Sequence, residues 1–240
     1  MYEERFYRDY IKPDNFINFT VIDKESDLHI SAKTNLNKEA KQCLENYRAC
    51  IKGYGDNDTE FYRSLAPLEV SLKADKIVKH MAVAAKNANV GPMAAVAGAI
   101  SHYVGLDLLK YTDEIIIENG GDIFIKTNRK RKILIYAGNS PFSEKIALSI
   151  SPEDTPLGIC TSAGTIGHSI SFGKADAVVV LSKDTLLADA AATAIGNIIR
   201  DPQDINKGIE YGKNIEGIEG ILIIIEDKMG VWGNIELVRP

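Results

Sequence analysis

Residues 158–196 have the sequence GICTSAGTIGHSISFGKADAVVVLSKDTLLADAAATAIG. Within them, residues 176–181 form a short apolar run rich in β-branched side chains, which predicts a buried strand. Ser182 and Asp184 follow directly, and both residue types commonly begin helices. The pattern therefore predicts a strand followed by a helix over about 185–200, and we expect the functional residues of the chain to gather here.

Asp189 and Thr193 lie four residues apart on the predicted helix, so their side chains share one face. Almost all their neighbours are alanines, which leaves this face polar but without bulk. A hard cation such as Mg²⁺ takes a few oxygen ligands and obtains the rest from water or phosphate, and a carboxylate and a hydroxyl one turn apart can begin to supply them. A second interpretation is that the alanines let two helices pack closely while Asp189 only favours the positive end of its helix. The spacing alone leaves both open.

A second alanine-rich helix is expected over residues 92–105, PMAAVAGAISHYVG, because Gly91 ends the preceding helix and proline is well tolerated in a first turn. Its segment MAAVA is similar to AAATA at residues 190–194. The similarity is too short to establish a duplication. It does predict two helices that approach closely enough for backbone carbonyls of one to come near side chains of the other.

Composition limits the possible domain organisation and the classes of partner. A chain of 240 residues with 45% hydrophobic content can bury a sizeable core, as a single domain or as two similar lobes around a central cleft. A net charge of -5 argues against nucleic acid as the main partner. The one basic run, KTNRKRK at residues 126–132, is predicted to be a solvated hairpin tip.

The three cysteines cannot all pair within one chain, and no CxxC spacing exists. Cys43 and Cys50 are expected to be core residues on one helix face, and Cys160 a small buried packing residue rather than a nucleophile. The first fifteen residues are charged and aromatic, unlike a signal peptide, and no later segment has the length of a membrane span. We therefore expect a cytoplasmic protein without membrane contact. Homo-oligomer formation is left open.

Periodicity and turn residues predict the remaining elements. Strands are expected over 16–22, 27–32, 114–118, 122–127, 133–136, 146–150, 220–226 and 230–238, and helices over 37–54, 59–65, 74–89 and 203–211. The pair Gly120-Gly121 fits either a tight turn with positive φ or a place where the backbone approaches a ligand. Because strands follow one another in runs with helices grouped between them, the expected fold is α+β with mostly antiparallel sheets.

Three segments in this order carry a family resemblance: Asn119-Gly120-Gly121-Asp122-Ile123, Thr161-Ser162-Ala163-Gly164 and ADAAATA at residues 188–194. They resemble the successive motifs of the ApbE-like superfamily, whose best-known members, once called thiamine biosynthesis lipoproteins, are FAD:protein FMN transferases. The resemblance covers about half the chain, residues 91–196. It implies an ApbE-like (T-fold-like) architecture and a Mg²⁺-dependent enzyme that cleaves FAD and attaches FMN to a threonine or serine of a target protein.

The resemblance also implies roles for particular residues. Asp189 and Thr193 match the metal-binding aspartate and threonine, and Ala94 matches the alanine whose backbone carbonyl can complete the metal site. The remaining matches lie on the flavin side, and they are Asn119, Gly120, Gly121, Asp122, Thr161, Ser162, Ala163 and Gly164.

Two departures from the family pattern bear on activity. The HIIDP-type segment of the transferases is shortened to residues 167–173, so that His168 stands near the family histidine, as a candidate proton acceptor, without the following Asp-Pro. The AKG motif is replaced by Ala94-Ala95-Val96, which removes a lysine. The chain therefore resembles a short, cytoplasmic branch of the superfamily, and both an FMN transferase and a non-catalytic flavin or nucleotide-binding protein remain in play.

Overall fold

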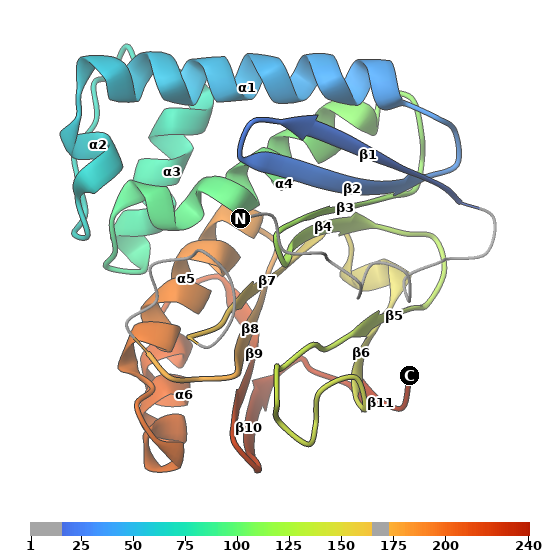
Figure 1. Ribbon diagram of the computed structural model, residues 1–240, viewed down its shortest axis with the longest axis vertical. Coiled ribbons are helices and arrows are strands. Elements are labelled where there is room, and N and C mark those ends of the chain that lie inside the picture. Colours follow the sequence, from blue (N-terminus) through green and yellow to red (C-terminus); the bar gives the residue numbers. More distant parts are fainter. Residues whose placement is uncertain (1–15, 165–172) are drawn as a thin grey trace.

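The computed structural model describes residues 16–164 and 173–240 (Figure 1). The larger of its two sheets has the strand order β1-β2-β3-β4-β7-β8-β9-β10, and the smaller has the order β11-β6-β5. The strands of the larger sheet are β1 (Ile17–Asp23), β2 (Ser26–Ala32), β3 (Ile115–Asn119), β4 (Asp122–Lys126), β7 (Leu157–Ser162), β8 (Ala177–Ser182), β9 (Ile218–Ile225) and β10 (Lys228–Gly233). Those of the smaller sheet are β5 (Arg131–Leu134), β6 (Ala147–Ile150) and β11 (Leu237–Val238). Every strand pairing within the described residues is antiparallel, which confirms the predicted α+β class.

Helices lie together on one side of the larger sheet, and the three-stranded sheet lies on the other (Figure 1). The α-helices are α1 (Asn37–Asn57), α2 (Glu60–Arg63), α3 (Lys76–Asn87), α4 (Val96–Leu108), α5 (Thr185–Ile198) and α6 (Ile205–Lys213). Short 3₁₀ turns η2 (Pro92–Ala95), η3 (Pro152–Asp154) and η4 (Pro202–Asp204) precede α4, β7 and α6.

Alternation along the central strands produces this three-layer arrangement, because successive side chains of a strand point to opposite faces of the sheet. In β8, Val178 and Val180 belong to the core under the helices. Val179 and Leu181 belong to a second core, shared with the small sheet. Strands covered on both faces must be apolar throughout. This explains the continuous hydrophobic run in β9.

The structure corrects four expectations. The single strand expected over 230–238 is divided, since β10 ends at Gly233 and β11 belongs to the smaller sheet. Helix α1 continues through Gly53 and Gly55 to Asn57 instead of ending at the glycines. Strand β7 was not predicted, because Gly158 interrupts its short apolar run, and the strand is held in place by pairing with β4 and β8. The basic run at 126–132 is not a hairpin tip, since β4 and β5 belong to different sheets and the run crosses between them.

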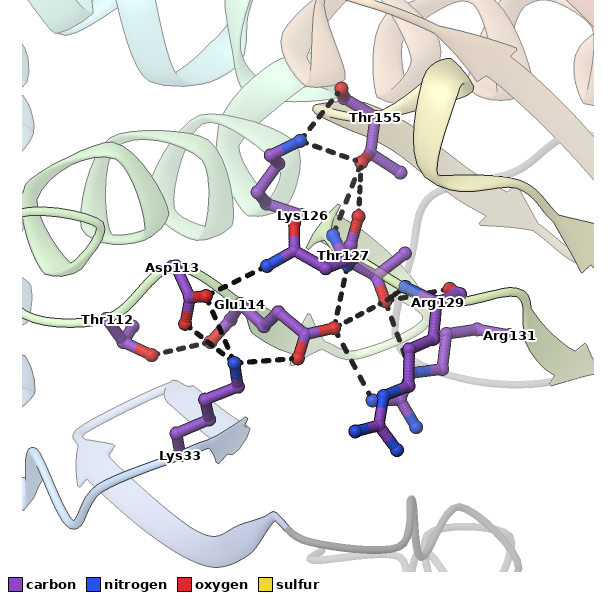
Figure 2. Close-up of polar contacts among 10 residues, drawn as sticks. Lys33, Thr112, Asp113, Glu114, Lys126, Thr127, Arg129, Arg131 and Thr155 are labelled. Atoms are coloured by element: carbon purple, nitrogen blue, oxygen red, sulfur yellow. Dashed lines mark hydrogen bonds and ion pairs between the residues drawn. The ribbon is translucent and has the colours of Figure 1, made fainter.

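Glu114 anchors that crossing with a buried network of polar contacts (Figure 2). Its carboxylate accepts hydrogen bonds from the Thr127 hydroxyl at 3.0 Å and the Asn128 amide at 2.7 Å. It also forms ion pairs with Lys33 at 3.2 Å and with Arg131 at 3.6 Å. One carboxylate therefore ties the end of β2, the start of β3 and the crossing segment together.

In the part of the chain that the structure describes, no helix has the length and apolar character needed to cross a membrane.

Candidate functional site

The first turn of α4 meets the middle of α5 at the point that the alanine-rich sequences predicted. Asp189 of α5 is buried there, and its Oδ2 accepts a 2.8 Å hydrogen bond from the Gly98 amide of α4. The neighbouring Ala97 amide also acts to lower the pKa of this carboxyl group. Because the first amides of a helix lack partners within the helix and carry partial positive charge, a carboxylate is well placed there. Asp189 therefore lies at the N-terminal, anion-binding end of a neighbouring helix. The sequence of α5 alone does not predict this contact.

Glycine is required at this crossing. A Cβ built on Gly98 would lie 2.6 Å from the Thr185 carbonyl oxygen and 2.8 Å from the Asp189 Cβ. Both are closer than side-chain atoms can approach, so the missing side chain is what lets the two helices bring amide and carboxylate together. A glycine inside an otherwise helical pattern was the sequence signal for this contact.

Asp122 lies on the sheet beneath the crossing. Phe124 and Cys160 belong to the core under the helices, so Asp122 and Ser162, two residues along their strands, face the same way. Asp122 is buried, and the Cys160 thiol and the Thr161 amide lie close enough to it to lower its pKa. Its Oδ1 and the hydroxyl oxygen of Ser162 are both buried without a hydrogen-bond partner among the described residues. Buried polar atoms normally have partners, so these two oxygens mark a place where a ligand or water is expected.

The two carboxyl groups affect one another. Burial raises the pKa of Asp189 to about 7, while the amides of Gly98 and Ala97 act in the opposite direction. Burial raises the pKa of Asp122 well above its usual range, and the negative charge of Asp189 adds to this effect. Two carboxylates close together in a buried place cannot both stay ionised without compensation. The pair therefore favours a bound proton or a bound cation.

The turn between β3 and β4 borders the same place. Gly120 and Gly121 have φ values of 68° and 105°, which confirms the positive-φ turn expected from the sequence. The Asn119 side chain donates a 3.2 Å hydrogen bond to the Ala97 carbonyl oxygen, and Glu118 accepts one of 2.8 Å from the Gly121 amide. The turn is thus joined to the start of α4.

The other predicted site residues do not all face this centre. Thr193, one turn beyond Asp189, and Ala94, in the 3₁₀ turn that packs against α5, are both partly buried. Thr161 points to the opposite face of the sheet from Ser162, where its Cβ lies 3.8 Å from the position of a Cβ on Gly121. Ala163 is partly buried, Gly164 is exposed, and the Gly164 amide donates to the Ala175 carbonyl. His168 lies outside the described residues.

Solved structures share this fold. The flavin transferase ApbE from Vibrio cholerae superposes with a TM-score of 0.63 at 14% identity, over 92% of this chain and 97% of that one. The ApbE protein from Thermotoga maritima gives a TM-score of 0.59 at 12% identity, over 90% and 96% of the two chains. The architecture is therefore the ApbE fold.

Sequence comparison is more specific. The family model described as AbpE bacteria matches residues 8–231. The UPF0280 protein of Methanococcus aeolicus is 44% identical over 201 residues, which is 82% of this chain and 81% of that protein. The UPF0280 protein of Methanocaldococcus jannaschii is 40% identical over 208 residues, or 84% of each chain. The chain belongs to the ApbE-like superfamily, in the group of UPF0280 proteins.

Proposed function

We propose that this protein binds a flavin nucleotide together with Mg²⁺ at the crossing of α4, α5 and the β3–β4 turn, and that it transfers FMN from FAD to a threonine or serine of a partner protein. The observation that carries the proposal is the pair of buried carboxyl groups, Asp122 and Asp189, at the positive end of α4. Their mutual effect on pKa and the unpartnered oxygen of Asp122 both fit a site that takes up a cation with its ligand.

The chemistry of the available donors suits Mg²⁺. No group of three or more His, Cys, Asp or Glu side chains in the described ranges has the arrangement of a metal centre. Mg²⁺ does not need such a group, because it is commonly held by one or two carboxylates plus substrate phosphates and water. Asp189, the Thr193 hydroxyl and the Ala94 carbonyl would hold it, and the diphosphate of FAD would complete its ligands.

The flavin side of the site is assigned to the Asn119-Gly120-Gly121-Asp122 turn and to residues 161–164. The positive-φ glycines leave the turn without side chains, so a planar ring can approach its backbone. Asp122 Oδ1 and Ser162 Oγ would then find their hydrogen-bond partners on the ligand.

In the transfer step, the acceptor hydroxyl oxygen attacks the phosphorus of the FMN portion, and the bond from that phosphorus to the AMP oxygen breaks. Bound Mg²⁺ supplies charge neutralisation of the diphosphate. The Gly98 amide holds Asp189 in place, and His168 accepts the proton of the incoming hydroxyl. AMP leaves with the electron pair of the broken bond.

One observation favours a second candidate function, flavin or nucleotide binding without transfer. Ala95 stands where the transferase motif has a lysine, and it is completely buried. A chain without that lysine retains the carboxylate pair but has lost one positive charge that the transferase pattern includes.

AMP release from FAD tests the proposal. Wild-type protein incubated with FAD, Mg²⁺ and candidate acceptor peptides should release AMP, and Asp189→Asn should abolish both the release and the Mg²⁺ dependence of FAD binding. Asp107→Asn, at the far end of α4, is the matched control and should leave both unchanged. FAD binding without AMP release would establish the second candidate, whereas absence of binding to any flavin or other nucleotide would refute both.

A further inference from the structure

A second polar contact joins α4 and α5, one turn away from the Gly98–Asp189 hydrogen bond. His102 Nδ1 lies 3.2 Å from the Thr185 hydroxyl oxygen. His102 follows Gly98 by four residues on α4, and Thr185 precedes Asp189 by four residues on α5, so the two contacts occupy successive turns of both helices. Together they fix how α5 is rotated and translated against α4.

Thr185 has little room to move. A Cβ added to Gly98 would lie 2.6 Å from the Thr185 carbonyl oxygen. A Cβ added to Gly158 in β7 would lie 2.5 Å from the Thr185 Cα. The same carbonyl oxygen accepts a hydrogen bond from the Cys160 thiol at 3.4 Å. Thr185 is therefore enclosed by α4 on one side and β7 on the other, and a shift at Thr185 moves the turn that carries Asp189.

His102 is held firmly on its side of the contact. Its ring packs edge to face against Phe124 and Tyr103, with centroids 5.5 Å away in both cases. His80 lies against it at 5.8 Å and is itself fixed by a 3.0 Å contact with Asp184, the residue that caps α5. Burial lowers the pKa of His102 to about 4, so its imidazole is neutral at physiological pH. A neutral, immobilised ring facing a hydroxyl makes a directional hydrogen bond rather than a charge interaction.

We propose that His102 and Thr185 are positioning residues for the Asp189 carboxylate, acting through the rotation of α5 on α4. Neither side chain is assigned a contact with ligand. They keep Asp189 on the Gly98 amide, and partners that orient a ligating carboxylate commonly change metal affinity by about 10–100-fold when they are removed. The expected loss of cation affinity rests on the proposed function. The expected weakening of the hydrogen bond from the Gly98 amide to Asp189 does not.

The test uses Thr185→Val and His102→Leu, which remove the hydrogen bond from either side, and Thr185→Ser, which restores the hydroxyl. Hydrogen exchange of the Gly98 amide, followed by NMR, reports on its bond to Asp189 without any ligand. Calorimetric titration with Mn²⁺, alone and with FAD, reports on the cation site. Tyr47→Phe is the control, since it removes a 2.6 Å hydrogen bond to Asp107 at the other end of α4.

Thr185→Val and His102→Leu should speed Gly98 exchange at least about tenfold and weaken Mn²⁺ binding at least about tenfold. Thr185→Ser should stay within about twofold of wild type in both. Tyr47→Phe should lower thermal stability without changing either quantity. Unchanged Gly98 exchange in both disruptive variants would overturn the positioning role. If wild type binds no Mn²⁺ while the variants still speed Gly98 exchange, the positioning role stands and the proposed function fails.

Discussion

Gly98→Ala tests the helix crossing on which the site depends. The new Cβ would lie 2.6 Å from the Thr185 carbonyl oxygen, whereas ordinary contacts begin at 3.4 Å, so α4 and α5 must separate by up to roughly 0.8 Å. A backbone oxygen cannot rotate away as a side chain can. The separation weakens the 2.8 Å hydrogen bond from the Gly98 amide to Asp189 as well.

Opposing effects decide the size of the change. Alanine gains up to about 1 kcal/mol over glycine in a helix interior. Overpacking costs about 1–3 kcal/mol, and weakening a hydrogen bond to a charged group costs up to about 1.5–3 kcal/mol more. The cost of overpacking and of the weakened hydrogen bond should exceed the gain in helix propensity. The expected net loss is roughly 1–3 kcal/mol in the free energy of unfolding, or about 2–4 °C in Tm for each kcal/mol.

Urea denaturation of Gly98→Ala beside Gly53→Ala measures this directly. Gly53 is exposed on α1, and a Cβ there meets nothing within 4 Å, so the same chemical change should stabilise the protein by about 0.5–1 kcal/mol. Equal stabilisation by the two substitutions would show that the helices are not in contact at Gly98 and would refute the reasoning about the site.

Three further predictions concern stability. Ala191→Leu should lower the free energy of unfolding by about 1–3 kcal/mol in urea denaturation, because Ala191 is completely buried; no loss would mean that this face is open. In metal-free protein, folded Asp189 keeps a proton up to a pKa of about 7 that the unfolded chain releases near 3.8, so this residue makes stability fall as pH rises between those values. Asp189→Asn should flatten that decline, and a variant with the wild-type slope would contradict the raised pKa. Burial raises the pKa of Glu114, but its hydrogen bonds and Lys33 outweigh burial and hold this pKa below its usual 4.5, so stability should fall as pH drops through that range. Glu114→Gln should lose that part of the acid dependence and about 1–3 kcal/mol at pH 7, as measured by urea titrations across pH.

Local sequence determined most of the secondary structure and the fold class. The apolar runs of β8 and β9 and the spacing of α3 predicted the elements closely, because burial and periodicity act within a few residues. The Gly120-Gly121 turn was equally predictable, since positive φ at adjacent positions strongly favours glycine. Strand β7 was not, because Gly158 interrupts its apolar run and its stability comes from pairing with β4 and β8.

Some features of the candidate site were also predictable from the sequence, and others were not. From the sequence alone, Asp189 and Thr193 are on one helix face, two alanine-rich helices are expected to meet, and a family resemblance assigns their roles. Only the tertiary structure places Asp189 on the Gly98 amide, Asp122 beneath it with an unpartnered oxygen, and His102 against Thr185. Each of these contacts joins residues from elements separated in sequence. Their energies depend on distance and burial in three dimensions, and neither quantity is present in the spacing of residues along the chain.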